Sequence, residues 1–320
     1  MAVEIGTASN HQDLMLKLEK FLTSNPALVA ANQQWEVKKD NVVLPYTTNT
    51  TADAGGYSLY RFFIGHGLDG QDNIVVPMVL RHNASLNYYT MTAYAARSYA
   101  TDKGVSEQLT DNAVGARWAT ISLWHTNMKY WFIANGRRFI IVVKVSNRYA
   151  TMYCGFIKPS GTDLEYPYPL LIGGNHTFSD SPYTNDDTST NRSFFNPQAS
   201  SSSSSSSSMI YTPSGRLCFL DNQGGGYIQT SSSYLIGVTY PYHYNYNIGK
   251  TLDNEYVLLD IDIVQWHGGM NHLGWFDGAY FVTGFENSPE NIITVGNDRY
   301  LCVSAMVQND YNNWVAIKLE

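Results

Sequence analysis

Acidic and imidazole side chains gather in the C-terminal third of the chain, where they could bind a metal ion. Asp260 and Asp262 lie in a strand-like run, His267 and His272 in the glycine-rich stretch that follows, and Asp277 shortly after. A zinc site needs three or four such ligands converging in tetrahedral geometry. The two histidines lie in a turn rather than on a helix, and the H-E-x-x-H pattern is absent. The sequence therefore predicts a hydrogen-bonded turn with solvent-facing imidazoles and no metal site.

The same aspartates are also candidates for acid–base chemistry on sugars. Alternation along a strand places Asp260 and Asp262 on one face, within reach of carboxylates such as Glu255 or Asp277. Tyrosine and tryptophan side chains nearby would suit stacking against a sugar ring. Like charges on one solvent face are, however, also a common protection of edge strands. We therefore predict no catalytic residue and keep carbohydrate binding or cleavage as an alternative.

Other kinds of active site have no support in the sequence. There is no G-x-S-x-G nucleophile motif, and no cysteine lies near a histidine in a recognisable setting. Gly224-Gly225-Gly226 is not followed by the Lys-Ser/Thr pair or the helix that a phosphate-binding loop needs. Cys154, Cys218 and Cys302 lie alone in apolar runs, which predicts buried free thiols. The protein is expected to use no cofactor and not to be an enzyme.

The composition favours a protein that works through contacts with other proteins. The 320 residues include 24 Tyr and 7 Trp, and only 15% of them are charged, compared with about 25% in a typical domain. Interfaces favour Tyr and Trp and exclude Lys and Glu, although all-β proteins are also rich in Tyr and Thr because these residues suit strands. The net charge of −7 argues against a sequence-independent grip on nucleic acid. We predict no signal peptide, no membrane-spanning run and no membrane partner.

The best-patterned stretch of the chain predicts three adjoining strands. Tyr130–Ala134, Arg137–Val145 and Tyr149–Ile157 are rich in aliphatic, aromatic and β-branched residues. Asn135-Gly136 is the strongest dipeptide signal for a type I′ turn, so the first two runs should pair as a hairpin. The third run follows after a short polar joint and should extend the antiparallel sheet. We expect these strands in the middle of a buried sheet, and the Arg137-Arg138 pair facing solvent.

A short amphipathic helix is predicted near the N-terminus. Asn10 is a suitable N-cap, and the negative charge of Asp13 in the first turn interacts favourably with the helix dipole. Apolar residues recur on one face from Leu14 to Leu22, and Pro26 then interrupts the pattern. The helix should pack on the sheet of its own chain, with docking on a neighbouring subunit as the alternative.

Strand-like runs separated by turn residues occupy most of the remaining sequence. The predicted fold class is mainly β, an antiparallel sandwich or barrel-like body with a short N-terminal helix. We divide the chain into an N-terminal helical arm at residues 1–34 and a β-rich body at residues 35–320. A long Ser/Thr/Asn-rich loop at about 175–208 ends in nine consecutive serines. Such a loop buries little apolar surface and should be a surface excursion from the body.

Two groups of aromatic residues in loops are the candidate interface. Phe194 and Phe195 interrupt the polar loop, which predicts that the two rings are anchored on the body or on a partner. A second loop is dense in tyrosine, a residue that gives large contact area at low entropic cost. Its candidate residues are Tyr240, Tyr242, Tyr244 and Tyr246. Stacking on bases or sugars is the other use of such a loop.

Several motifs resemble those of structural proteins of tailed bacteriophages. They are the run YWFIANGRRFIIVVKV at Tyr130–Val145, Y-x-x-M-Y-x-G-F at Tyr149–Phe156, E-Y-P-Y-P-L at Glu165–Leu170, Gly173-Gly174, and the segments Gly65–Gly70, Phe276–Phe281 and Asn291–Val295. The resemblance extends over most of the chain. Such proteins are described as virion or tail-associated components, so the resemblance implies a structural role. It does not imply a particular part of the particle, and it transfers no catalytic residues.

The expected function is that of a structural component of a tailed-phage particle, in the tail, baseplate or neck. The protein would contact copies of itself and other virion proteins, and would be found in the virion and, during assembly, in the host cytoplasm. One alternative is a carbohydrate-binding or carbohydrate-cleaving protein of the tail tip, with a glycan as partner. Another is a capsid decoration or head-completion protein. A receptor-binding fibre would be expected to show repeats or a coiled coil, and the sequence shows neither.

Overall fold

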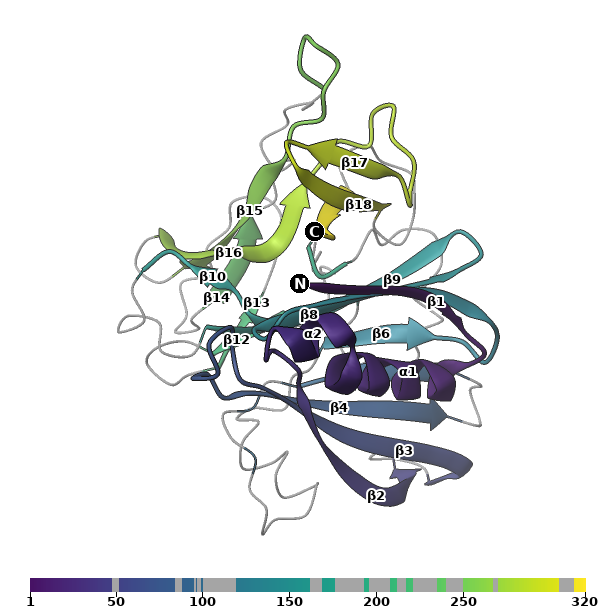
Figure 1. Ribbon diagram of the computed structural model, residues 1–320. Helices are drawn as coiled ribbons and strands as arrows, with labels where there is room; N and C mark the ends of the chain where they lie inside the picture. The colour runs from purple at the N-terminus through teal and green to yellow at the C-terminus, as the bar shows by residue number, and fades with distance from the viewer. Residues whose placement is uncertain are drawn as a thin grey trace.

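The fold is mainly β and antiparallel, with two helices near the N-terminus (Figure 1). The computed structural model describes residues 1–47, 52–83, 88–94, 96, 99, 119–161, 169–175, 193–195, 208–211, 217–220, 235–239, 250–266, 270–304 and 314–320. The described strands form a five-stranded sheet and a 14-stranded sheet, and among their pairings only that of β13 (Leu217–Leu220) with β14 (Leu235–Thr239) is parallel. The predicted fold class is confirmed. Among the described residues, no helix is long and apolar enough to cross a membrane.

The N-terminal segment forms β1 (Ala2–Ala8), α1 (His11–Ser24) and α2 (Pro26–Ala30). The Asn10 side chain accepts a hydrogen bond from the Asp13 N–H at 2.9 Å, so the predicted N-cap of α1 is confirmed. Asn25 caps α2 in the same way, with Pro26 at the first helical position. The predicted apolar face of α1 is buried in the core of its own chain. Strand β1, which the sequence did not predict, pairs along its whole length with β7.

The five-stranded sheet runs in the order β2-β3-β4-β5-β6, so each strand pairs with the next one along the chain. Its strands are β2 (Glu36–Thr47), β3 (Ala52–Gly65), β4 (Ile74–Asn83), β5 (Tyr88–Ala93) and β6 (Ala119–Leu123). Figure 1 shows α1 lying between β1 and β4, and residue contacts of α1 with β1, β2, β4 and β7 agree with this view. The helix therefore lies between the two sheets and fills part of the space that separates them.

The 14-stranded sheet begins at β1 and ends at β17, in the order β1-β7-β8-β9-β11-β12-β13-β14-β15-β16-β19-β18-β17, with β10 paired to β16. The strands not yet given are β7 (Met128–Ala134), β8 (Arg138–Val145), β9 (Arg148–Phe156), β10 (Lys158–Pro159), β11 (Leu170–Gly173), β12 (Ser208–Tyr211), β15 (Leu259–Trp266), β16 (Met270–Phe281), β17 (Ile292–Val295), β18 (Asp298–Ser304) and β19 (Trp314–Lys318). The three strands predicted at the centre are β7, β8 and β9, and their antiparallel pairing is confirmed.

Both faces of β7, β8 and β9 are buried, because the molecule has three layers. Side chains such as Phe132 and Ile141 face α1 and the five-stranded sheet in a first core. Their strand neighbours, such as Trp131 and Ile140, face the C-terminal strands β15, β16, β18 and β19 in a second core. The large sheet thus folds back so that its C-terminal strands cover its own middle. Burial on both faces explains why β8 is a nearly continuous apolar run rather than an alternating one.

Candidate functional site

The structure gives the aspartates singled out in the sequence different partners. Asp262 on β15 lies with its Oδ1 3.1 Å from Nε2 of His272 on β16. Asp277 has other partners and accepts hydrogen bonds from Asn135 and Arg138. Asp260 is exposed on β15, and His267 lies outside the described residues. Within the described part of the chain, no group of three or more His, Cys, Asp or Glu residues is placed to hold a metal ion.

The aromatic residues proposed for an interface fall into two groups. The side chains of Phe194 and Phe195 are buried in the second core, and the Phe194 ring packs against Tyr153 and Phe276 with centroids 5.8 and 5.3 Å apart. These rings are therefore anchored on the body of their own chain. The tyrosines at positions 240, 242, 244 and 246 lie outside the described residues. Cys154 and Cys302 are free and buried, as predicted.

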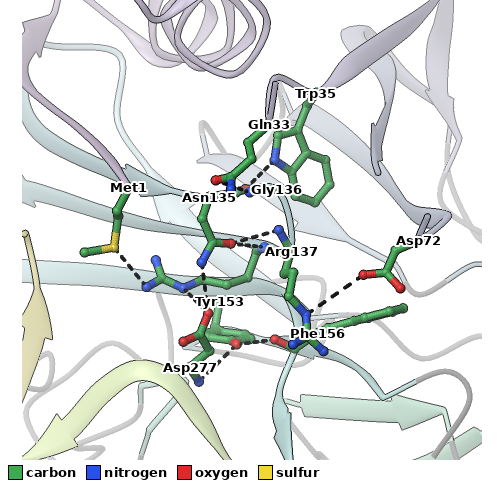
Figure 2. A network of polar contacts seen from close by, with 11 residues as sticks. Met1, Gln33, Trp35, Asp72, Asn135, Gly136, Arg137, Tyr153, Phe156 and Asp277 are labelled. Carbon is green, nitrogen blue, oxygen red and sulfur yellow. Dashed lines mark hydrogen bonds and ion pairs between the residues drawn. The ribbon is translucent and has the colours of Figure 1, made fainter. Parts of the chain in front are cut away.

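A network of polar contacts surrounds the turn between β7 and β8, and we call it the turn junction (Figure 2). The Trp35 indole Nε1 donates to the Asn135 carbonyl at 2.8 Å, and the Gly136 N–H donates to Oε1 of Gln33 at 3.3 Å. The Gly67 N–H, from the connection between β3 and β4, donates to the Gly136 carbonyl at 2.9 Å. One four-residue turn therefore joins the N-terminal segment, the five-stranded sheet and the middle layer.

The turn itself differs from the predicted type I′. The Asn135 N–H donates to the Arg138 carbonyl at 3.0 Å, so Gly136 and Arg137 are the two central residues, and neither has a positive φ. The Asn135 Oδ1 accepts the N–H groups of Arg137 at 2.8 Å and Arg138 at 2.9 Å, and this local bonding stabilises the turn. Glycine is needed for space instead, because a Cβ at position 136 would lie 1.8 Å from the Gly67 carbonyl oxygen.

Arg138 is the charged centre of the turn junction. Its side chain is only 1% exposed, so the prediction that the arginine pair faces solvent is wrong for Arg138. Its Nε lies 3.3 Å from Oδ2 of Asp277, and its Nη2 lies 3.3 Å from the Met1 sulfur. A buried guanidinium needs such a carboxylate because an unpaired buried charge is costly. Arg137, in contrast, is partly exposed, with Nε 4.0 Å from Oδ2 of Asp72.

Tyr153 extends the turn junction into the second core. Its hydroxyl donates to the Phe156 carbonyl at 2.7 Å and accepts the Asp277 N–H at 3.3 Å. Burial raises the pKa of Tyr153 well above its usual range, and the nearby Asp277 carboxylate adds to the effect. The phenol therefore stays neutral and serves as a fixed hydrogen-bonding bridge between β9 and β16.

A second charged cluster lies at the opposite end of the β7–β8 hairpin, and we call it the Glu290 cluster. The Glu290 carboxylate accepts hydrogen bonds from Lys129 at 2.5 Å, from the Tyr149 hydroxyl at 2.9 Å and from Lys144. Burial alone would raise the pKa of Glu290, but the hydrogen bonds from these three side chains outweigh it and lower the pKa to about 2. Lys129 and Lys144 are cross-strand neighbours, so one carboxylate fixes both strands to the C-terminal layer.

Three histidines gather around Tyr89 in a third cluster, which we call the histidine cluster. His82 stacks on the Tyr89 ring with centroids 4.6 Å apart, and His125 lies 5.4 Å from the same ring. His11, the first residue of α1, lies 4.2 Å from Tyr89 and 5.4 Å from His125. Burial is the main reason why the pKa of His11 falls to about 4, and the neighbouring imidazoles of His125 and His82 lower it further.

Sequence reasoning missed these three clusters for one reason. Arg138 and Asp277 are 139 positions apart, and Lys144 and Glu290 are 146 positions apart. No spacing rule for a helix, strand or turn connects residues so distant in the chain. The Arg138–Asp277 and Lys144–Glu290 contacts link the middle layer to the C-terminal layer. No protein-family model matches the chain, and no curated protein matches it either.

Proposed function

We propose that this protein is a structural component of a tailed-phage particle, in the tail, baseplate or neck. It acts by contacts with copies of itself and with other virion proteins. The observation that carries the proposal is that carboxylates among the described residues pair with basic side chains of another layer. Two carboxylates hold the layers together, with Asp277 bound to Arg138, and Glu290 bound to two lysines and a tyrosine.

Composition supports the same proposal. Only 15% of the residues are charged while 24 are tyrosine, and this balance resembles that of protein interfaces more than that of free surfaces. A particle component must also keep one shape while neighbours load it from several sides. Three β layers with fixed polar links between them suit that requirement.

One observation favours the carbohydrate alternative. The His272 ring, paired with Asp262, lies 4.6 Å from the Trp275 ring, and Asp260 is exposed on the neighbouring strand. An aromatic ring beside carboxylates is a combination that binds or cleaves sugars. A capsid decoration or head-completion protein would have the same architecture, and only its position in the particle would differ.

The proposal is tested on purified particles of the phage that encodes the chain. We expect mass spectrometry of gradient-purified particles to find the protein at a fixed number of copies. Immunogold labelling with antibodies against the purified chain should place it on the tail, baseplate or neck. Labelling of the capsid would support the decoration alternative. A protein present in infected cells and missing from particles would overturn the structural proposal.

The carbohydrate alternative is tested with separate Asp260→Asn, Asp262→Asn and Asp277→Asn variants in a polysaccharide binding and cleavage screen. Loss of a measurable activity in the Asp260 and Asp262 variants would support it. The Asp277 variant is an informative control, because it also removes the partner of Arg138 and should reduce stability whether or not sugar is bound. Absence of binding and cleavage in the unaltered protein would exclude this alternative.

A further inference from the structure

Among the described residues, the strand order of the large sheet ends at β1 and β17, and that of the small sheet ends at β2 and β6. An edge strand presents a row of N–H and C=O groups that can pair with a strand of another molecule. Natural proteins block such pairing with charged residues, proline or a covering segment. The four edges of this protein differ in how far they are blocked.

Three of the edges carry such protection. Strand β2 has two lysines, an aspartate and a proline along its length. The segment after β11 lies along β6, where the Asn175 N–H donates to the Thr120 carbonyl at 3.0 Å. On β1, the Lys17 side chain donates to the Thr7 carbonyl at 2.6 Å. Each of these strands is therefore poorly suited to add a further strand.

Strand β17 has none of these features. Its four residues are Ile-Ile-Thr-Val, without charge or proline. Ile293 is buried against the C-terminal layer, whereas Ile292 is 36% exposed, Val295 is 39% exposed and Thr294 is exposed as well. Among the described residues, β17 pairs only with β18. Three apolar or β-branched side chains are thus presented on an open, unprotected edge.

The hydrogen-bond pattern shows which backbone groups face this edge. The Cys302 N–H donates to the Asn291 carbonyl at 2.8 Å, so this carbonyl faces β18. Arg299, which lies opposite Thr294, bonds to the other side of β18, because its N–H donates to the Glu320 carbonyl at 3.2 Å and its carbonyl accepts the Leu319 N–H at 2.8 Å. Hydrogen-bonded and non-hydrogen-bonded pairs alternate along an antiparallel ladder. Ile293 and Val295 therefore also bond to β18, while Ile292 and Thr294 direct their N–H and C=O groups to the open side.

We propose that β17 of one copy pairs antiparallel with β17 of a second copy, about a two-fold axis at Ile293. This register sets Ile292 opposite Thr294 of the second copy, so both residues exchange N–H and C=O bonds in a symmetric pair. Because β17 has no charged residue, this register brings no like charges of the two strands together. The C-terminal layers of the two copies then form one continuous sheet. This pairing would be one of the contacts between copies that the proposed structural function requires, and it rests on that proposed function.

The interface is short, so a single pair associates weakly and gains strength when other contacts hold the copies together. The test is sedimentation equilibrium of the purified chain over a wide concentration range. We expect a concentration-dependent dimer. Thr294→Pro should weaken it at least about tenfold, because the lost N–H occurs twice in a symmetric pair. Thr294→Val keeps the N–H and should leave the dissociation constant within about twofold.

Thr294→Pro should leave the fold intact because its N–H takes no part in the ladder with β18, and circular dichroism checks this. If the proline variant unfolds, Ile292→Lys carries the test by placing a charge on the edge, and it should also give a monomer. A wild-type protein that is monomeric at every concentration, or a dimer that persists in the folded edge variants, overturns the pairing. Because particle composition is measured separately, a monomer that is still found in particles overturns the pairing alone.

Discussion

Some charged side chains of this protein are buried, where the loss of hydration is unfavourable in free energy. Arg138 is almost completely buried and has Asp277 as its carboxylate partner at 3.3 Å. Asp277 is partly exposed, so its removal would leave the charge of Arg138 uncompensated in the interior. In the histidine cluster, burial makes protonation of His11 unfavourable and lowers its pKa.

We expect Asp277→Ala to lower the free energy of unfolding by about 3 kcal/mol, because Arg138 would remain buried without its carboxylate. Asp298→Ala is the matched control. Asp298 is also an aspartate on a strand paired with a basic side chain, but its partner Lys318 is 32% exposed whereas Arg138 is 1% exposed. Lys318 can therefore be solvated without its carboxylate, and the loss should cost less than about 1 kcal/mol. Urea denaturation measures both variants. Equal losses would show that Arg138 does not depend on Asp277.

Acid should destabilise the protein through His11. Its pKa falls from the ordinary 6.5 to about 4 on folding, so the unfolded chain binds its proton first as the pH decreases. This contribution is fully present above pH 6.5 and is lost as the pH falls through about 4, which amounts to about 3 kcal/mol. Urea denaturation between pH 7 and pH 4 should follow this trend.

The controls for the acid prediction are two histidine variants. His11→Phe keeps an aromatic side chain beside Tyr89 and should flatten the pH dependence of the unfolding free energy between pH 7 and pH 4. His66, an exposed histidine in the connection between β3 and β4, offers the comparison His66→Phe, which should leave the dependence unchanged. A wild-type curve with no slope in this range would contradict the role of His11.

At the scale of elements, the β7–β8 hairpin is shaped by what lies against its turn. An isolated Asn-Gly hairpin favours a type I′ turn because its twist matches that of the strands. Here the β3–β4 connection comes so close that the Gly67 N–H bonds to the Gly136 carbonyl. The turn therefore adopts a conformation that accommodates a second loop, and its glycine provides room for that loop.

Gly136→Ala tests this close approach without any change in preferred φ, because Gly136 does not have a positive φ. The added Cβ would meet the Gly67 backbone, so we expect a loss of about 2–3 kcal/mol in thermal or urea unfolding. Gly70→Ala is the control. Gly70 has a φ of +81° and nothing within 4 Å of an added Cβ, so only its backbone preference is lost, at about 1 kcal/mol. A neutral Gly136→Ala would mean that the two loops separate easily.

At the scale of the whole molecule, the C-terminal layer is fastened to the middle layer at both ends of one hairpin. In the turn junction at one end, Asp277 of the C-terminal layer bonds to Arg138. In the Glu290 cluster at the other end, Glu290 bonds to Lys129 and Lys144. Between them lies the second core. Such an arrangement predicts that loss of one fastening loosens the C-terminal layer and spares the five-stranded sheet.

Glu290→Gln should therefore speed amide hydrogen exchange in β16, β18 and β19 about tenfold, with little change in β3 and β4. Glu286→Gln is the matched control, since Glu286 shares a positive φ with Glu290 but pairs with Lys250 at a more exposed site. Exchange mass spectrometry of the two variants measures the effect. Uniform acceleration in both sheets would show that the layers open together rather than separately.

Features that depend on neighbouring residues in the chain can be predicted from the amino-acid sequence. Aliphatic and β-branched runs were sufficient to predict β7, β8 and β9 and their antiparallel order, and Asn10 with the apolar face of α1 was sufficient to predict the helix and its cap. These are local effects of backbone preference, hydrogen bonding and side-chain periodicity. The general fold class follows from them.

Other features depend on contacts between segments that are distant in the chain, and the sequence does not reveal them. The burial of Arg138, the gathering of three histidines around Tyr89, and the type of turn at Gly136 all follow from contacts with remote parts of the chain. A β-branched residue favours a strand whichever segments later pack against that strand. The position of a charged residue in the sequence does not show which distant residue will be its partner. The arrangement of layers supplies these partners, so the polar links appear only when the layers are packed together.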